Sequence, residues 1–194
     1  MKSRHLILLP LLAALLSPFA RAQSPTFEIE PQQSSIKFYV KASVALTGAF
    51  DKWDATLKFT SPEVTSGVLD IEIQSASVDT GSGMKNNKLK GKDFFDVEQN
   101  PVISFKSTKI VQTGPNTFSV PGTFTIRGVS NPETLTLTVI NPKTDKSDVH
   151  GKMVFDRKDY GMNKGIPFIK IADHVEVTIH LKVTRTGGPL LIEK

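Results

Sequence analysis

Residue-by-residue alternation of apolar and polar side chains is the feature that most limits how this chain can fold. The clearest run places Val175, Val177, Ile179, Leu181 and Val183 between polar or charged residues. A period of two puts alternate side chains on opposite faces of a β-strand. This run therefore predicts a strand with one buried and one solvated face.

Shorter runs with the same period recur along most of the chain, at residues 36–42, 55–59, 69–73, 103–105, 118–126, 135–139 and 153–155. They are separated by short turn signals such as Ser61-Pro62 and Asn141-Pro142, which favour antiparallel neighbours. About eight strands with one apolar face each predict an all-β barrel or sandwich.

Two segments break the alternation. Residues 81–100 are polar and poor in β-branched side chains, which predicts a short helical insertion near residues 83–97. In a helix, Lys85, Lys88 and Lys92 would share one face. Residues 157–173 form a long loop rich in apolar side chains, and we expect it to act as a flap over an apolar site.

Residues 1–22 have the pattern of a secretory signal peptide. Lys2 and Arg4 precede an apolar stretch at residues 6–16, and Ala20-Arg21-Ala22 supplies the small residues of a cleavage site. The apolar stretch is shorter than the roughly 20 residues that span a bilayer. We therefore expect cleavage before Gln23 and a periplasmic location.

Composition limits the partners and the chemistry of the remaining chain. The full sequence has 24 basic and 19 acidic residues; three of the basic residues lie in the leader, which leaves 21 against 19. This balance argues against a nucleic-acid partner. There are no cysteines, which excludes disulfides and a catalytic thiol. We predict one domain over residues 23–185, followed by a flexible tail at 186–194.

Several motifs occur in order along the chain, at Phe27–Pro31, Ser77–Gly81, Asp93–Val97, Gly122–Pro132 and Arg157–Met162. Together they resemble the YceI-like family of exported, polyisoprenoid-binding, lipocalin-like bacterial proteins over almost the whole mature chain. The resemblance implies an eight-stranded antiparallel lipocalin-like barrel whose apolar cavity holds a long isoprenoid chain. It implies no metal and no catalytic residues.

The chain departs from the family pattern at three positions. Members commonly carry histidines where this sequence has Gln33, Ala42 and Lys88. An imidazole contact to a ligand head group therefore cannot be carried over to this chain.

Strand phase and the resemblance together predict the residues of a binding site. The expected cavity lining is Ile36, Phe38, Val40, Leu57, Phe59, Leu69, Ile71, Ile73, Phe105, Phe124, Leu137, Phe155, Met162, Phe168, Val177 and Ile179. The expected head-group site is Lys85, Lys88, Lys92, Phe94 and Phe95. Strand phase alone fits a packed core equally well, and the lysines also fit a solvated helix face anchored by the Phe pair.

The predicted function is that of a periplasmic lipid-binding protein, a monomer or homodimer without a cofactor. It would sequester or transport a long-chain polyisoprenoid, with transient membrane-surface contact as an additional expectation. One alternative is a protein-interaction module that uses the apolar 162–171 loop. A lipid-modifying enzyme is less favoured, because the inward positions are apolar and no GxSxG motif is present. His150, His174 and His180 lack metal-ligand spacing.

Overall fold

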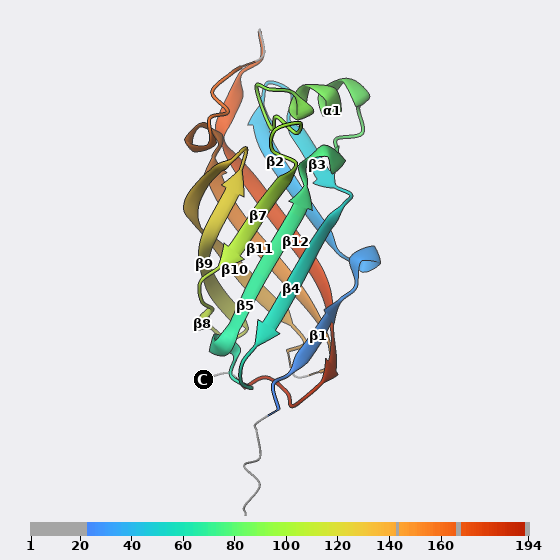
Figure 1. The fold of residues 1–194 in the computed structure, drawn as a ribbon, viewed down its shortest axis with the longest axis vertical. Helices are drawn as coiled ribbons and strands as arrows, with labels where there is room; N and C mark the ends of the chain where they lie inside the picture. The colour runs from blue at the N-terminus through green and yellow to red at the C-terminus, as the bar shows by residue number, and fades with distance from the viewer. Residues whose placement is uncertain (1–22, 143, 166–167, 193–194) are drawn as a thin grey trace, which may run out of the picture.

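The computed structural model describes residues 23–142, 144–165 and 168–192, so the predicted signal peptide and Ile166 lie outside the described residues. A single antiparallel sheet dominates this part of the chain (Figure 1). Its strands are β1 (Thr26–Ile29), β2 (Ser35–Ala42), β3 (Leu46–Phe50), β4 (Trp53–Phe59), β5 (Gly67–Gln74), β6 (Val78–Asp79), β7 (Val102–Ser107), β8 (Val111–Gly114), β9 (Thr117–Ile126), β10 (Val129–Ile140), β11 (Lys146–Asp156) and β12 (Ile171–Gly187). The helices are α1 (Gly83–Lys90) and four 3-10 turns at Pro31–Gln33, Val64–Ser66, Ser75–Ser77 and Arg157–Tyr160.

The twelve described strands follow eight paths around a barrel. The sheet order is β4-β5-β7-β9-β10-β11-β12-β2-β3-β6, with β1 on β12 and β8 on β9. Consecutive strands share a path where a short interruption divides them, as in β1 with β2, β3 with β4, and β5 with β6. The predicted all-β barrel is confirmed, and the higher strand count reflects these interruptions.

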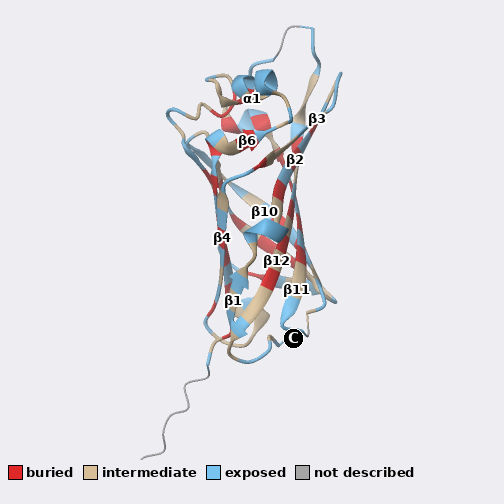
Figure 2. Cartoon of the chain, turned by 90° about the vertical axis from the view of Figure 1, so that its right-hand side faces the viewer, coloured by how far each residue is buried: buried red, intermediate tan, exposed pale blue. Residues whose placement is uncertain are grey.

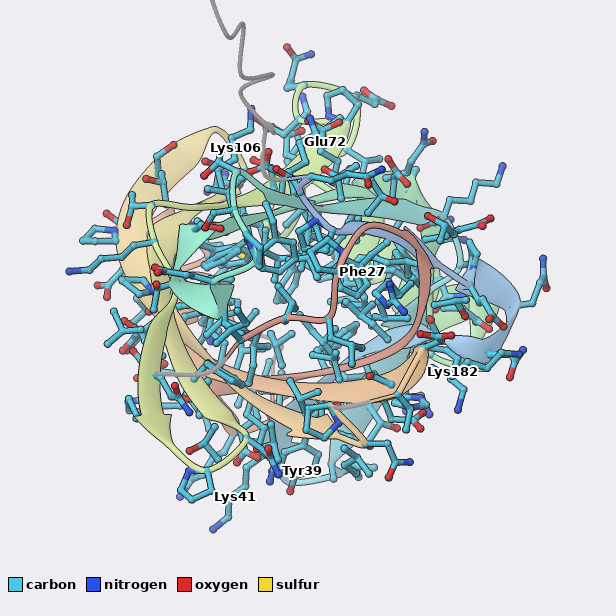
Figure 3. The ribbon with its side chains drawn as sticks, turned by 90° about the horizontal axis from the view of Figure 1, so that it is seen from below. Phe27, Tyr39, Lys41, Glu72, Lys106 and Lys182 are labelled. Carbon is cyan, nitrogen blue, oxygen red and sulfur yellow. The ribbon has the colours of Figure 1, made fainter. Side chains whose placement is uncertain are left out.

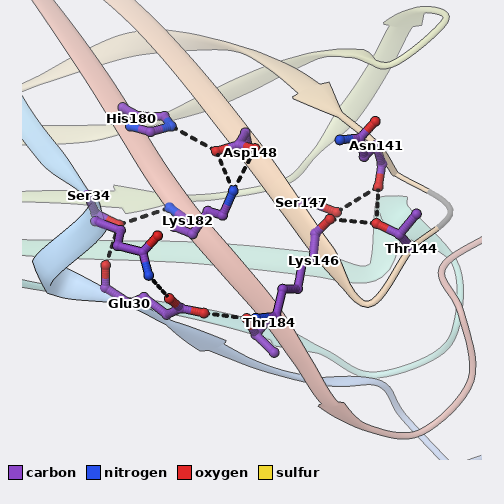
Figure 4. Close-up of polar contacts among 11 residues, drawn as sticks. Glu30, Ser34, Asn141, Thr144, Lys146, Ser147, Asp148, His180, Lys182 and Thr184 are labelled. Atoms are coloured by element: carbon purple, nitrogen blue, oxygen red, sulfur yellow. Dashed lines mark hydrogen bonds and ion pairs between the residues drawn. The ribbon is translucent and has the colours of Figure 1, made fainter.

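The interruption between β1 and β2 is held against β12 by polar contacts (Figure 4). The backbone N–H of Glu30 donates to Lys182 O at 2.9 Å, and the N–H of Lys182 donates to Ser34 Oγ at 2.9 Å. The 3-10 turn Pro31–Gln33 therefore bulges outward while β12 continues past it. Next to it, Asp148 accepts hydrogen bonds from Lys182 Nζ.

Buried and exposed residues alternate along many of the strands (Figure 2), as expected where one face of each strand is turned to the barrel interior. In the view from below, Tyr39, Lys41, Glu72 and Lys106 lie at the periphery, whereas Phe27 lies towards the middle (Figure 3). The alternation in the sequence is thus realised as an apolar interior.

The half of the barrel opposite α1 is packed with side chains. A Cβ placed on Gly151 would lie 3.1 Å from both Leu137 Cδ2 and Ile179 Cβ, and one on Gly122 would lie 2.7 Å from Phe105 Cζ. These inward-facing glycines let large side chains fill the middle of the barrel. No space for a ligand remains where those side chains meet.

The predicted boundary of the tail falls inside an ordered strand. β12 extends to Gly187, two residues beyond the predicted domain end. Farther along, Ile192 exchanges backbone hydrogen bonds with Pro62 and Val64, which ties this segment to the loop after β4.

Candidate functional site

A cavity of about 460 Å³ occupies the end of the barrel next to α1. It lies between α1, the 157–173 loop and the inner faces of seven strands. Its lining consists of Ile36, Lys37, Phe38, Val40, Ala42, Val44, Leu46, Phe50, Ile73, Met84, Lys85, Lys88, Leu89, Phe94, Phe95, Ile103, Phe124, Ile126, Phe155, Arg157, Met162, Ile169, Ile171, Val175 and Val177. Among the described residues that line it, none carries a carboxylate, an imidazole or a hydroxyl group. The interior is thus apolar, with basic groups at its border.

Half of the predicted lining is brought together in this cavity: Ile36, Phe38, Val40, Ile73, Phe124, Phe155, Met162 and Val177. Five other predicted residues are buried in the packed half instead: Leu69, Ile71, Phe105, Leu137 and Ile179. Leu57 and Phe59 border a separate hollow of about 310 Å³ between β1 and β4, and Phe168 is fully exposed. Strand phase identifies which side chains face the interior but not how far along the barrel axis each one lies. For this reason only half of the predicted residues line the cavity.

Other lining residues were not predicted. Four of them continue the apolar phase of their own strands: Ala42, Ile103, Ile126 and Val175. The alternation in the sequence could therefore have identified these four residues as inward-facing. Arg157 had no such signal, because a charged residue at the end of a strand reads as solvated.

The Phe pair that follows α1 serves both as an anchor and as cavity wall. Phe94 and Phe95 are buried, and the N–H of Phe95 donates to Leu89 O at 2.9 Å. The Phe95 ring centroid lies 5.9 Å from that of Phe50 and 6.5 Å from that of Phe38. These aromatic contacts hold the α1 segment over the barrel end.

The three predicted head-group lysines do not act as one group. Lys85 and Lys88 line the cavity, but Lys88 Nζ forms an ion pair with Asp93 at 2.8 Å. The hydrogen bond from Lys88, together with its charge, lowers the pKa of the Asp93 carboxyl. The prediction that Lys92 shares their helix face is wrong, because α1 ends at Lys90 and Lys92 lies outside the lining.

A single buried guanidinium, that of Arg157, fastens both ends of the 157–173 loop. At the start of the loop, Arg157 Nη1 donates to Met162 O and to Lys164 O. At the end of the loop, Arg157 Nε donates to Ala172 O at 3.2 Å, and Nη2 bonds to Asp173 Oδ1 at 3.1 Å. Since Arg157 and Met162 also line the cavity, this clamp fixes the loop as part of the cavity wall.

A buried tyrosine of the same 3-10 turn supports two aromatic rings of the cavity wall. The Tyr160 ring packs 5.4 Å from Phe124 and 5.2 Å from Phe155, and its hydroxyl donates to Glu133 Oε1 at 3.0 Å. Burial raises the pKa of Glu133, and the hydrogen bond from Tyr160 partly opposes that shift. The contact holds two cavity-lining aromatic rings in place.

Two of the three positions where the family commonly has histidine face the cavity, and the third does not. Gln33 lies on the outer bulge and donates to Glu30 Oε2 at 2.5 Å, whereas Ala42 and Lys88 line the cavity. Having Ala42 and Lys88 in place of the family's histidines therefore changes the surface that a ligand would meet in the cavity.

Within the described residues, no group of three or more His, Asp or Glu side chains is arranged to hold a metal ion. None of the helices in the same part of the chain has the length and hydrophobicity of a membrane span.

Comparison with known proteins identifies the fold family. Residues 27–183 match the YceI-like domain. The chain belongs to the YceI-like family. A UPF0312 protein of Pseudomonas savastanoi pv. phaseolicola is 27% identical over 170 residues, which cover 84% of this chain and 88% of the relative. A UPF0312 protein of Shewanella denitrificans is 25% identical over 167 residues, 82% of this chain and 87% of the relative.

Two solved structures are similar across most of the YceI-like chain. BcnA of Burkholderia cenocepacia has a TM-score of 0.73 and 28% identity, over 80% of this chain and 99% of BcnA. A polyisoprenoid binding domain from Saccharophagus degradans, implicated in plant cell wall breakdown, has a TM-score of 0.66 over 83% of this chain and 99% of that domain. At 17% identity, the second similarity concerns the fold alone.

Proposed function

We propose that this chain binds a long-chain polyisoprenoid, of isoprenoid quinone or polyprenyl phosphate type, with the tail inside the apolar cavity. The observation that carries the proposal is the lining: about 460 Å³ enclosed by aliphatic and aromatic side chains, with basic groups at the border. The volume lies in the range of about 300–1,000 Å³ that is usual for small-molecule sites. The polyisoprenoid-binding name of the Saccharophagus degradans domain supports the same ligand class.

The apolar tail supplies the affinity. Burying about 20 methylene-equivalents at roughly 0.8 kcal/mol each gives a gross gain near 16 kcal/mol. The costs of association and ordering leave room for micromolar or tighter binding. Apolar contacts discriminate poorly between one isoprenoid tail and another. The specificity of binding therefore depends on the polar groups at the cavity mouth.

Lys85 and Lys88 are the groups placed to meet a head group. Both border the cavity on the α1 side, and an ammonium group favours an anionic or strongly polar partner. The proposed role is sequestration or transport in the periplasm after export, as a monomer or homodimer and without a cofactor. Binding is preferred to catalysis because the described lining carries no carboxylate, imidazole, hydroxyl or thiol group, and its lysines stand at the border of an otherwise apolar cavity.

Native mass spectrometry of the mature protein, gently purified from a periplasmic extract, tests the proposal. We expect an adduct whose extracted mass is that of a polyprenyl chain. A clean apo mass that persists after incubation with ubiquinones and polyprenyl phosphates would contradict it. That outcome would favour the protein-interaction module.

Two lysine variants and one control test the head-group contact. Replacing Lys85 or Lys88 with Gln is expected to weaken binding of a polyprenyl phosphate up to about fivefold each, the usual limit for partly exposed charge pairs. Binding of a neutral quinone should not change. Lys92→Gln, in the same segment but outside the lining, is the matched control. Equal losses of polyprenyl phosphate affinity in all three variants would show that Lys85 and Lys88 do not contact the head group.

A further inference from the structure

We propose that the mouth of the cavity docks on an anionic phospholipid bilayer. The contact surface is the mouth patch, defined as Val44, Met84, Phe168 and Ile169 and flanked by Lys85, Lys164 and Lys170. The inference rests on the proposed function, since it names the source from which the apolar ligand would enter.

The mouth patch gathers apolar side chains that packing does not explain. Met84 is 85% exposed, Val44 is 71% exposed and Phe168 is fully exposed. They come from α1, from the β2–β3 turn and from the 157–173 loop, which meet at one end of the barrel (Figure 1). Contiguous exposed apolar side chains of this kind mark an interaction surface.

The mouth patch is continuous with the cavity. Val44, Met84 and Ile169 also belong to the cavity lining, so one apolar surface runs from the interior to the outside. The backbone of Ser43 donates to Lys170 O at 2.9 Å, which holds the β2–β3 turn beside the loop. The patch is therefore built into the fold at the cavity entrance.

The charges around the patch fit a lipid surface. Lys85, Lys164 and Lys170 are exposed, and none of them has an ion pair within the described part of the chain. Asp93, the acid whose pKa is lowered by Lys88 and more weakly by Lys164, is already bonded to Lys88. Apolar tips flanked by free lysines are typical of interfacial binding to anionic bilayers.

A protein partner fits this surface less well. Protein interfaces are depleted in Lys and draw most of their energy from Trp, Tyr and Arg. Three lysines flank the mouth patch, and the patch itself contains none of those three residue types. A bilayer contact also lets an isoprenoid tail pass between lipid and cavity without crossing water.

Flotation with vesicles that contain no isoprenoid tests the docking separately from ligand binding. We expect the mature protein to float with vesicles of equal parts phosphatidylcholine and phosphatidylglycerol, and much less with pure phosphatidylcholine. The double variant Lys164→Gln/Lys170→Gln should lower the partition coefficient about 25-fold, at about fivefold per lysine. Lys106→Gln/Lys152→Gln removes the same charge from the barrel wall and should have little effect.

The apolar part of the patch has its own pair of variants. Phe168→Ser should weaken vesicle binding about tenfold or more, because a buried Phe side chain is lost from the bilayer contact. Val154→Ser, which changes an exposed residue on the outer face of β11, is the control and should bind as the wild type does.

The other possible results bear separately on the docking proposal and on the proposed ligand. Equal losses in the wall and mouth variants would show nonspecific charge attraction. Wild-type dimers in solution that Phe168→Ser dissociates, with no vesicle binding, would make the patch a contact between copies of the chain. An isoprenoid adduct without vesicle binding would refute docking alone, whereas vesicle binding without any isoprenoid uptake would refute only the proposed ligand.

Discussion

Replacing Val177 with Trp is expected to fill the cavity and weaken ligand binding while the barrel stays folded. Val177 lines the cavity from β12, where it pairs with Phe38 on β2 and Met153 on β11. The indole adds about seven heavy atoms and displaces a similar number of methylene groups, a gross loss of about 6 kcal/mol at roughly 0.8 each. If the tail recovers about half of that loss by shifting, binding weakens by more than about 100-fold.

The same substitution in the packed half should have the opposite profile. Leu137 faces Gly151, where even an added Cβ would lie 3.1 Å from the leucine Cδ2. Leu137→Trp therefore overpacks the core and is expected to lower the free energy of unfolding by about 1–3 kcal/mol. Its ligand affinity should stay near that of the wild type.

Calorimetric titration with geranylgeraniol measures the affinity, and urea unfolding followed by far-UV circular dichroism measures the stability. Circular dichroism avoids the signal of Trp53, the one tryptophan in the sequence. Val154→Trp on the exposed face of β11 controls for the added indole. Unchanged binding by Val177→Trp would show that the ligand lies elsewhere. Loss of binding by folded Leu137→Trp would refute the division of the barrel into a packed half and an open half.

Two further predictions concern the cavity walls. Arg157→Met should free both ends of the 157–173 loop, because charge-assisted hydrogen bonds worth about 3 kcal/mol or more are lost, and tryptic cleavage after Lys164 should rise more than about tenfold. Lys158→Met, which removes only an exposed ion pair, is the control, and similar cleavage in both variants would contradict the clamp. Because burial raises the pKa of Glu133 above its ordinary value of 4.5, the fold loses stability as the pH rises through the folded-state pKa. Glu133→Gln should therefore have a higher urea midpoint than the wild type at pH 7 and a similar one near pH 4, and a lower midpoint at pH 7 would contradict this reasoning.

The strands and their inward faces could be predicted from the sequence because a period of two is a local property. Depth in the barrel is not local. Ile71 and Ile73 share one face of β5, yet Ile71 pairs with Phe105 in the packed half and Ile73 pairs with Ile103 beside the cavity. The difference depends on how β5 is staggered against β7 and on which side chains its distant neighbours present. No pattern within β5 records either.

The polar part of the site was harder to predict for a related reason. The lysine spacing suggested one helix face, but the N–H of Gly91 bonds to Lys88 O and the chain turns away before Lys92. Arg157 donates to three backbone carbonyl groups up to 15 residues along the chain, and carbonyl groups carry no sequence signal. Side chains that bind backbone atoms of a loop become recognisable only once the loop is folded.

The two ends of the barrel are closed by different means, and this difference favours ligand exchange at one end only. Below the cavity, side chains from several strands meet across Gly151 and Gly122, so a ligand could pass that way only by displacing packed core side chains. Above the cavity, the cover is the α1 segment and the 157–173 loop, held mainly by the Phe pair and by Arg157. Segments with few ladder hydrogen bonds open at lower free energy than the sheet does. A ligand that enters the cavity is therefore expected to pass between α1 and the loop, where the mouth patch lies.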